Sequence, residues 1–224
     1  RAKLGASDAY AFDQLSVTQR AYFGGRPLTM RPFEGVLAFH ATPENDNKYL
    51  LEDVAGRGLG LTTSAKIADR LAGQIADLVL CGHSHQQRIV RTARNEGFSL
   101  VVNPGSVGCP AYDDGLLTPY ADAPLTPHIS ESGSPHARYA IVAKRGAVWS
   151  AELFAINYDW TAPPRERQPH VQHLSLDDGA NVHAVLLRDA RIARAPAARV
   201  QILHDAAIAI VCLQRIPARR HQID

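Results

Sequence analysis

One apolar segment that ends in two histidines constrains the fold more than any other part of the sequence. Residues 78–81 are Leu-Val-Leu-Cys, and they lead directly into Gly82, His83, Ser84 and His85. So short an apolar run, closed by a glycine, is typical of a strand that is buried on both faces. In an extended backbone, side chains two residues apart share a face, so we expect both imidazoles to project together. Such a pair suits one divalent metal ion, or one each of two neighbouring ions.

Two further strands deliver polar residues at their carboxyl ends. Residues 35–39 form an apolar segment that ends at His40, and residues 98–102 lead into Asn103. An isolated histidine is more often a partly buried polar side chain than a ligand. In α/β proteins, however, ligand-binding sites commonly lie at the edge of the sheet where the carboxyl ends of several strands meet. We therefore expect His40 and Asn103 to lie near the two histidines.

The order of these motifs resembles that of the calcineurin-like metallophosphoesterases, in particular their small prokaryotic branch. The resemblance rests on Gly-His-Ser-His at 82–85, on Asn-Pro-Gly-Ser-Val-Gly at 103–108, and on the earlier strand that ends at His40. It covers roughly residues 1–160. It implies an α/β fold in which a mixed sheet packs against a second sheet as a sandwich, with flanking helices, incomplete at the N-terminus.

The resemblance also implies a chemistry, which is the hydrolysis of phosphate mono- or diesters by two divalent metal ions such as Mn, Fe, Ni or Zn. Carried onto the matching positions, it makes His40 and His83 ligands of one ion and His85 a ligand of the other. It makes Asn103, together with Gly82 and Ser84 of the histidine motif, supporting residues. The expected partner is a phosphate-ester substrate.

Three motifs of that family are absent from the sequence. No Asp-x-His and no Gly-Asp precede His40, and no Gly-Asn-His occurs anywhere. In the family these motifs supply the bridging carboxylate, an asparagine ligand and the histidine that protonates the leaving oxygen. We therefore expect an N-terminally truncated member whose three-histidine half-site holds metal weakly and turns over little or no substrate, and we assign no catalytic residue.

A non-catalytic fragment or a protein-binding scaffold derived from the same fold is the alternative function. Loss of the leading strands would expose a sheet edge and apolar surface, which would favour a homo-oligomer or aggregation. A structural zinc domain would need four closed ligands, and the sequence offers three.

The composition changes abruptly after Trp160. All fifteen aromatic residues and all the lysines lie at or before that position. We expect the domain to span residues 1–160. We expect residues 161–224 to be disordered, a reading-frame artefact, or a helical appendage, since Val182–Arg194 and Ala197–Ile216 are compatible with helices.

Charge, cysteine content and hydropathy indicate a cytoplasmic protein. The formal net charge of +2 gives no signal for nucleic acid or a membrane surface. Three cysteines without a paired spacing favour a reducing compartment. No apolar run is long enough to cross a bilayer, and no signal peptide opens the sequence.

Local patterns predict several further elements. Ser16 and Gln19 have the spacing of a capping box before a helix that reaches residue 23, and Thr63 or Ser64 can cap a helix with an apolar stripe at positions 67, 71 and 75. Hairpins are expected for residues 88–102 and 139–156. We expect residues 56–60 to form a mobile connection, and His128 and His136 to be surface residues.

Overall fold

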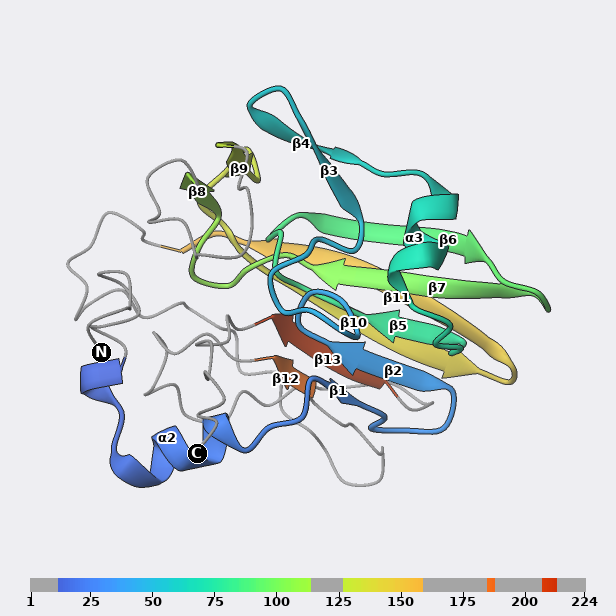
Figure 1. Ribbon diagram of the computed structural model, residues 1–224, viewed down its shortest axis with the longest axis horizontal. Helices are drawn as coiled ribbons and strands as arrows, with labels where there is room; N and C mark the ends of the chain where they lie inside the picture. Colours follow the sequence, from blue (N-terminus) through green and yellow to red (C-terminus); the bar gives the residue numbers. More distant parts are fainter. Residues whose placement is uncertain (1–11, 114–126, 159–184, 188–206, 213–224) are drawn as a thin grey trace, which may run out of the picture.

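The computed structural model describes residues 12–113, 127–158, 185–187 and 207–212, which form a mixed α/β protein made mostly of strands (Figure 1). The expected α/β class is confirmed at this level. The described helices are α2 (Val17–Gly24) and α3 (Ser64–Arg70). The described strands are β1 (Thr29–Met30), β2 (Val36–Phe39), β3 (Glu52–Ala55), β4 (Gly58–Leu61), β5 (Leu78–Leu80), β6 (Gln87–Ala93), β7 (Phe98–Pro104), β8 (Ala111–Asp113), β9 (Ile129–Glu131), β10 (Ala137–Arg145), β11 (Val148–Ile156), β12 (Val185–Leu187) and β13 (Ala207–Cys212).

A five-stranded mixed sheet in the order β1-β2-β5-β7-β6 positions the strand ends that the sequence singles out. Its three inner strands, β2, β5 and β7, run parallel, and the outer strands β1 and β6 are antiparallel to their neighbours. The predicted buried strand is confirmed, since every residue of β5 has zero exposed surface. Because β2, β5 and β7 are parallel neighbours, His40, His83 and Asn103 all come from the same edge of the sheet.

A second sheet in the order β11-β10-β13-β12 packs against one face of the first. The hairpin expected for residues 139–156 is confirmed as β10 and β11. One face of β11 presents Trp149, Ala151 and Leu153 to a buried cluster that includes Ala38, Leu80 and Val102 of the first sheet. Every second side chain of β11 therefore faces the first sheet, as expected where one sheet packs on another.

Two strands of the second sheet come from the segments that the sequence presents as helix-compatible. Val185–Leu187 and Ala207–Cys212 are strands, and β13 pairs with β10. The helical interpretation is therefore wrong for these residues, because pairing with a sheet overrides their helix propensity. The expected boundary at residue 160 and the rest of the tail lie outside the described residues.

The opposite face of the first sheet is covered by α3 and by the chain before it. Lys66 donates its backbone N–H to the Thr63 hydroxyl, which confirms the predicted N-cap. Ile67 and Leu71 are 1% and 6% exposed, as the stripe requires, but Ile75 is 64% exposed. The stripe is wrong at this last position because α3 ends at Arg70 and the chain then turns.

The glycine-rich stretch after residue 55 is not an irregular connection: residues 56 and 57 turn the chain and residues 58–60 belong to β4, while its expected mobility stays a prediction. Strands β3 and β4 pair in register, and Gly56 occupies the turn with φ of 62°. Asp53 ties this hairpin to α3 through contacts with Lys66 and Arg70, and it also accepts a hydrogen bond from Thr62, which precedes the helix. Figure 1 shows the hairpin at the top of the molecule, with the chain passing from it into α3.

Two other local predictions are confirmed. The backbone N–H of Ser16 donates to the Gln19 side chain at 2.9 Å, and Gln19 donates its own N–H to the Ser16 hydroxyl at 3.2 Å, which is a capping box at the start of α2. Strands β6 and β7 form the hairpin expected for residues 88–102. Within the described ranges, no helix is long and apolar enough to cross a membrane.

Candidate functional site

The ends of β2 and β5 bring two of the three predicted ligands together. The backbone N–H of Gly82 donates to the His40 carbonyl at 2.7 Å, which joins the two strand-end loops. The Nε2 atom of His40 and the Nδ1 atom of His83 are 3.2 Å apart. His40 is 8% exposed and His83 is partly exposed, so the pair lies at the margin of the buried interior.

The backbone that carries these histidines is not extended, contrary to the expectation from the sequence. Strand β5 ends at Leu80, and the backbone N–H of Ser84 folds back to the Gly82 carbonyl at 2.8 Å. His83 and His85 have φ of 66° and 58°, in the left-handed region that side chains other than glycine rarely adopt. Such a conformation persists where surrounding contacts over-determine it, and it is common at functional sites.

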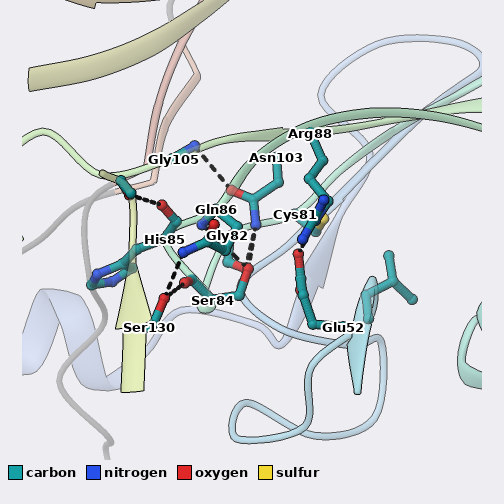
Figure 2. A network of polar contacts seen from close by, with 12 residues as sticks. Glu52, Cys81, Gly82, Ser84, His85, Gln86, Arg88, Asn103, Gly105 and Ser130 are labelled. Atoms are coloured by element: carbon teal, nitrogen blue, oxygen red, sulfur yellow. Dashed lines mark hydrogen bonds and ion pairs between the residues drawn. The ribbon is translucent and has the colours of Figure 1, made fainter. Parts of the chain in front are cut away.

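A buried polar network holds this loop in place (Figure 2). Asn103, with zero exposed surface, donates through Nδ2 to the Gly82 carbonyl and to the Ser84 hydroxyl, both at 2.9 Å. Its Oδ1 accepts the backbone N–H of Gly105 at 3.0 Å. Ser130 donates its hydroxyl to the Ser84 carbonyl at 2.7 Å. The carboxamide of Asn103 therefore stabilises the conformation of the loop.

His85 is buried and contacts the chain that follows β7. It is 1% exposed, and its Nδ1 lies 2.8 Å from the Cys109 carbonyl. Because a carbonyl can only accept, Nδ1 carries a proton, and in the neutral ring the lone pair is then on Nε2. Metal-binding histidines usually orient their rings by such a bond from the second nitrogen. The ring of Tyr112 meets His85 edge-on, with centroids 5.1 Å apart.

Three aromatic residues that the sequence did not indicate complete the surroundings of the histidines. Tyr49 lies against His83, with ring centroids 4.9 Å apart. Its hydroxyl oxygen is 2.6 Å from that of Tyr112 and 2.7 Å from Nε2 of His128. His128 is 3% exposed, so its assignment to the surface is wrong, and His136 is half-buried. No local pattern marks these residues, because they meet only through the fold.

The surroundings of His83 favour its neutral form. Removal of the ring from water is the largest cause, and together with the positive charges that His85 and His128 can carry it lowers the pKa of His83 from 6.5 to about 4, against a hydrogen bond to the backbone of Asn47. A histidine binds metal through a neutral nitrogen. His83 is therefore in its ligand form throughout the neutral pH range.

Glu52 is a buried carboxylate behind the histidine loop that sequence reasoning also missed. Its side chain is 1% exposed and accepts a hydrogen bond from Nε of Arg88 at 2.8 Å. Burial raises the pKa of Glu52, and the Arg88 guanidinium that it pairs with opposes this rise. In Figure 2, Glu52 and Arg88 lie on one side of Ser84, and the ring of His85 lies on the other.

The described residues fit a pair of metal ligands better than a complete centre. Two nitrogens bound to one tetrahedral ion at about 2.1 Å are about 3.4 Å apart, close to the separation of the histidine pair. Within residues 12–113 and 127–158, however, no group of three or more His, Cys, Asp or Glu side chains is placed to hold a metal ion. The geometry therefore supports two ligands for one ion and leaves the two-ion centre without a full ligand set among these residues.

Comparison of the sequence with models of protein families gives no match, and comparison with curated proteins gives none either.

Proposed function

We propose that this chain carries the histidine half of a divalent-metal centre in a calcineurin-like metallophosphoesterase fold, with phosphate mono- or diesters as the substrate class. The observation that carries the proposal is the 3.2 Å separation between Nε2 of His40 and Nδ1 of His83, at the ends of two adjacent parallel strands. Support for the fold comes from the mixed sheet packed against a second sheet, and from the strand-end placement of the motifs at 82–85 and 103–108.

The residues of this chain hold and orient ligand nitrogens. His40 and His83 would bind one ion, and His85, with its tautomer set by the Cys109 carbonyl, would present Nε2 to a second. A bound ion of this kind polarises phosphoryl oxygens and lowers the pKa of bound water. Neutral imidazoles leave the charge of a divalent cation uncompensated, so we expect weak binding and little or no turnover.

A non-catalytic scaffold is the second candidate function. It is favoured by the lack of a three-ligand group among the described residues. In either case we place the protein in the cytoplasm, because the three cysteines of the sequence show no paired spacing, which favours a reducing compartment.

Metal content and turnover separate these proposals. At equilibrium across a dialysis membrane with excess Mn²⁺ or Zn²⁺ on both sides, we expect the purified protein to bind close to one ion per chain and His83→Ala to bind none. His136→Ala is the matched control and should bind as the unmodified protein does. Metal content near zero in the unmodified protein would favour the scaffold, and robust hydrolysis of an aryl phosphate that is lost in His83→Ala would overturn the view that the centre is impaired.

A further inference from the structure

His85 is held by a short two-stranded ribbon, formed by β8 and β9, to which the metal-binding proposal gives no role. The peptide groups before and after this histidine each present a carbonyl, and both carbonyls accept a hydrogen bond from a serine hydroxyl. Ser130 donates to the Ser84 carbonyl at 2.7 Å, and Ser132 donates to the His85 carbonyl at 3.1 Å. Both peptide groups are therefore tied to the same segment of chain.

These two bonds act on the only two soft angles of the His85 backbone. Because a peptide group is planar, the orientations of the groups before and after a residue determine its φ and ψ. The φ of His85 is 58°, a value that is uncommon for residues other than glycine and that persists where the surroundings impose it. Hydroxyls that hold the carbonyls on both sides impose such a conformation.

Gln86 completes this arrangement from the position after His85. Its side-chain amide donates to the Ser130 hydroxyl at 2.8 Å and to the Glu131 carbonyl at 3.0 Å. A hydroxyl has one proton and two lone pairs, so Ser130 gives its proton to the Ser84 carbonyl and accepts from Gln86 at the same time. Ser130 has zero exposed surface, so water does not compete for these bonds. Figure 2 shows Ser130 joined to both residues.

The β8 side of the ribbon contacts the ring of the same histidine. The Cys109 carbonyl, just before β8, lies 2.8 Å from the ring Nδ1, and the ring of Tyr112 meets the imidazole edge-on. Tyr112 is paired with Ser130 in the ladder, and the N–H of Ser132 donates to the Pro110 carbonyl at 2.9 Å. The contacts to the ring and those to the backbone therefore come from one paired unit.

The ribbon is also anchored away from the histidine loop. The N–H of Ile129 donates at 2.7 Å to the carbonyl of Arg57, in the turn between β3 and β4. Beyond β9, the Arg138 side chain of β10 donates to the carbonyls of Ser132 and Ser134. The two serine hydroxyls are therefore carried by a segment whose own place is fixed by other parts of the fold.

We propose that the β8–β9 ribbon is a positioning element of the histidine site, in which Ser130 and Ser132 maintain the left-handed backbone of His85 and so set the direction of its ring. Asn103 acts on an earlier part of the loop, through the Gly82 carbonyl. The part of this proposal that concerns a metal ion on His85 rests on the proposed function. The part that concerns conformation does not, because every bond in the ribbon is made by protein groups.

Nuclear magnetic resonance of the metal-free protein tests the conformation directly. A left-handed residue gives a strong contact between its own amide and Hα protons, and we expect this signature at His83 and His85 in the unmodified protein. Ser130→Ala/Ser132→Ala should lose it at His85 and retain it at His83, because Asn103 holds the peptide group before His83. Ser150→Ala, which removes a strand hydroxyl that donates to a different carbonyl, is the control and should leave both signatures unchanged.

The tautomer of His85 gives a second readout, which a general loss of stability would not change. With the ring neutral, we expect its nitrogen chemical shifts to report the Nδ1–H form in the unmodified protein, because the Cys109 carbonyl accepts that proton. The double variant should show a mixture of the two tautomers, since a ring that leaves this carbonyl loses the bond that selects one form. Ser150→Ala should keep the Nδ1–H form.

A folded double variant with an unchanged backbone signature and tautomer at His85 would overturn the proposal, and so would an equal loss of the signature at His83. If the double variant does not fold, Ser132→Ala and Ser132→Thr replace it. The signature at His85 should weaken in the first and persist in the second, which keeps the hydroxyl, and identical spectra would be equally decisive. Failure of the unmodified protein to bind Zn²⁺ would refute the proposed function and leave these spectra to decide this inference.

Discussion

The histidine pair and the polar network beside it are adjacent, yet they satisfy their polar atoms in different ways. In the network, the carboxamide of Asn103 donates twice and accepts once, each time to a protein group. In the pair, ring nitrogens of His40 and His83 face each other at 3.2 Å, where only one proton fits between them. The network is therefore complete as a protein structure, whereas the hydrogen bond of the pair joins two nitrogens at a spacing that would also suit a shared cation. Substitutions in the network should affect stability first, and those in the pair should affect metal binding first.

The largest effect is expected for Asn103→Leu. This change removes three buried hydrogen bonds and leaves the Ser84 hydroxyl and the Gly105 N–H short of a partner. At about 1–3 kcal/mol for each unsatisfied group, we expect the free energy of unfolding in urea to fall by about 4 kcal/mol. Asn45→Ala, in an exposed turn, is the control and should cost less than about 1 kcal/mol. A loss below that value for Asn103→Leu would contradict the structural role of the network.

Arg88→Met should have the next largest effect. It leaves the Glu52 carboxylate buried without its cation, and breaking a buried pair from one side costs about 3 kcal/mol. The double variant Arg88→Met/Glu52→Gln should recover most of this loss, because it removes the uncompensated charge. The stabilities of the single and double variants are measured by chemical denaturation. Equal values would show that the uncompensated charge of Glu52 is not the cause of the loss in Arg88→Met.

The pH dependence of stability probes the pair. The folded-state pKa of His83, about 4, lies below its ordinary value of 6.5, so between these values the unfolded chain binds a proton that the folded chain does not. The stability that comes from the neutral ring is present above pH 6.5 and is lost as the pH falls towards 4. We expect a loss of about 2 kcal/mol at pH 5 relative to pH 8.

His83→Gln isolates this contribution, since Glu52 and the other titrating groups remain in both proteins. The variant should show a shallower fall in stability between pH 8 and pH 5 than the unmodified protein. Identical slopes would mean that the ring of His83 is not removed from water as the structure describes.

Tyr49→Phe should have the smallest effect. It tests whether the cluster of Tyr49, Tyr112 and His128 contributes to stability, as the polar network does, or to metal binding, as the histidine pair does. The change removes hydroxyl contacts with Tyr112 and His128 but keeps the ring against His83. We expect a loss of about 1 kcal/mol in stability with Zn²⁺ affinity unchanged. Tyr22→Phe, on the exposed face of α2, controls for a general tyrosine effect. A fall in Zn²⁺ affinity with no loss of stability would instead show that the Tyr49 hydroxyl acts together with the histidine pair in metal binding.

The sequence by itself determined the features that depend on neighbours along the chain. The buried strand at 78–80, the capping box at Ser16, the N-cap at Thr63 and both long hairpins follow from local periodicity, hydrogen-bonding residues at set spacings, and turn chemistry. These patterns were also sufficient to place His40, His83 and Asn103 at one edge of a sheet, because parallel neighbouring strands end together.

Tertiary structure alone decided how the site is built around those strand ends. Tyr49 and His128 are 79 residues apart in the chain, and Glu52 and Arg88 are 36 apart, so no local pattern could pair them. The left-handed histidines are also invisible in the sequence, because an isolated peptide would avoid that conformation. Contacts from several strands together outweigh its local cost, and they exist only once the sheet has brought distant residues within hydrogen-bonding distance.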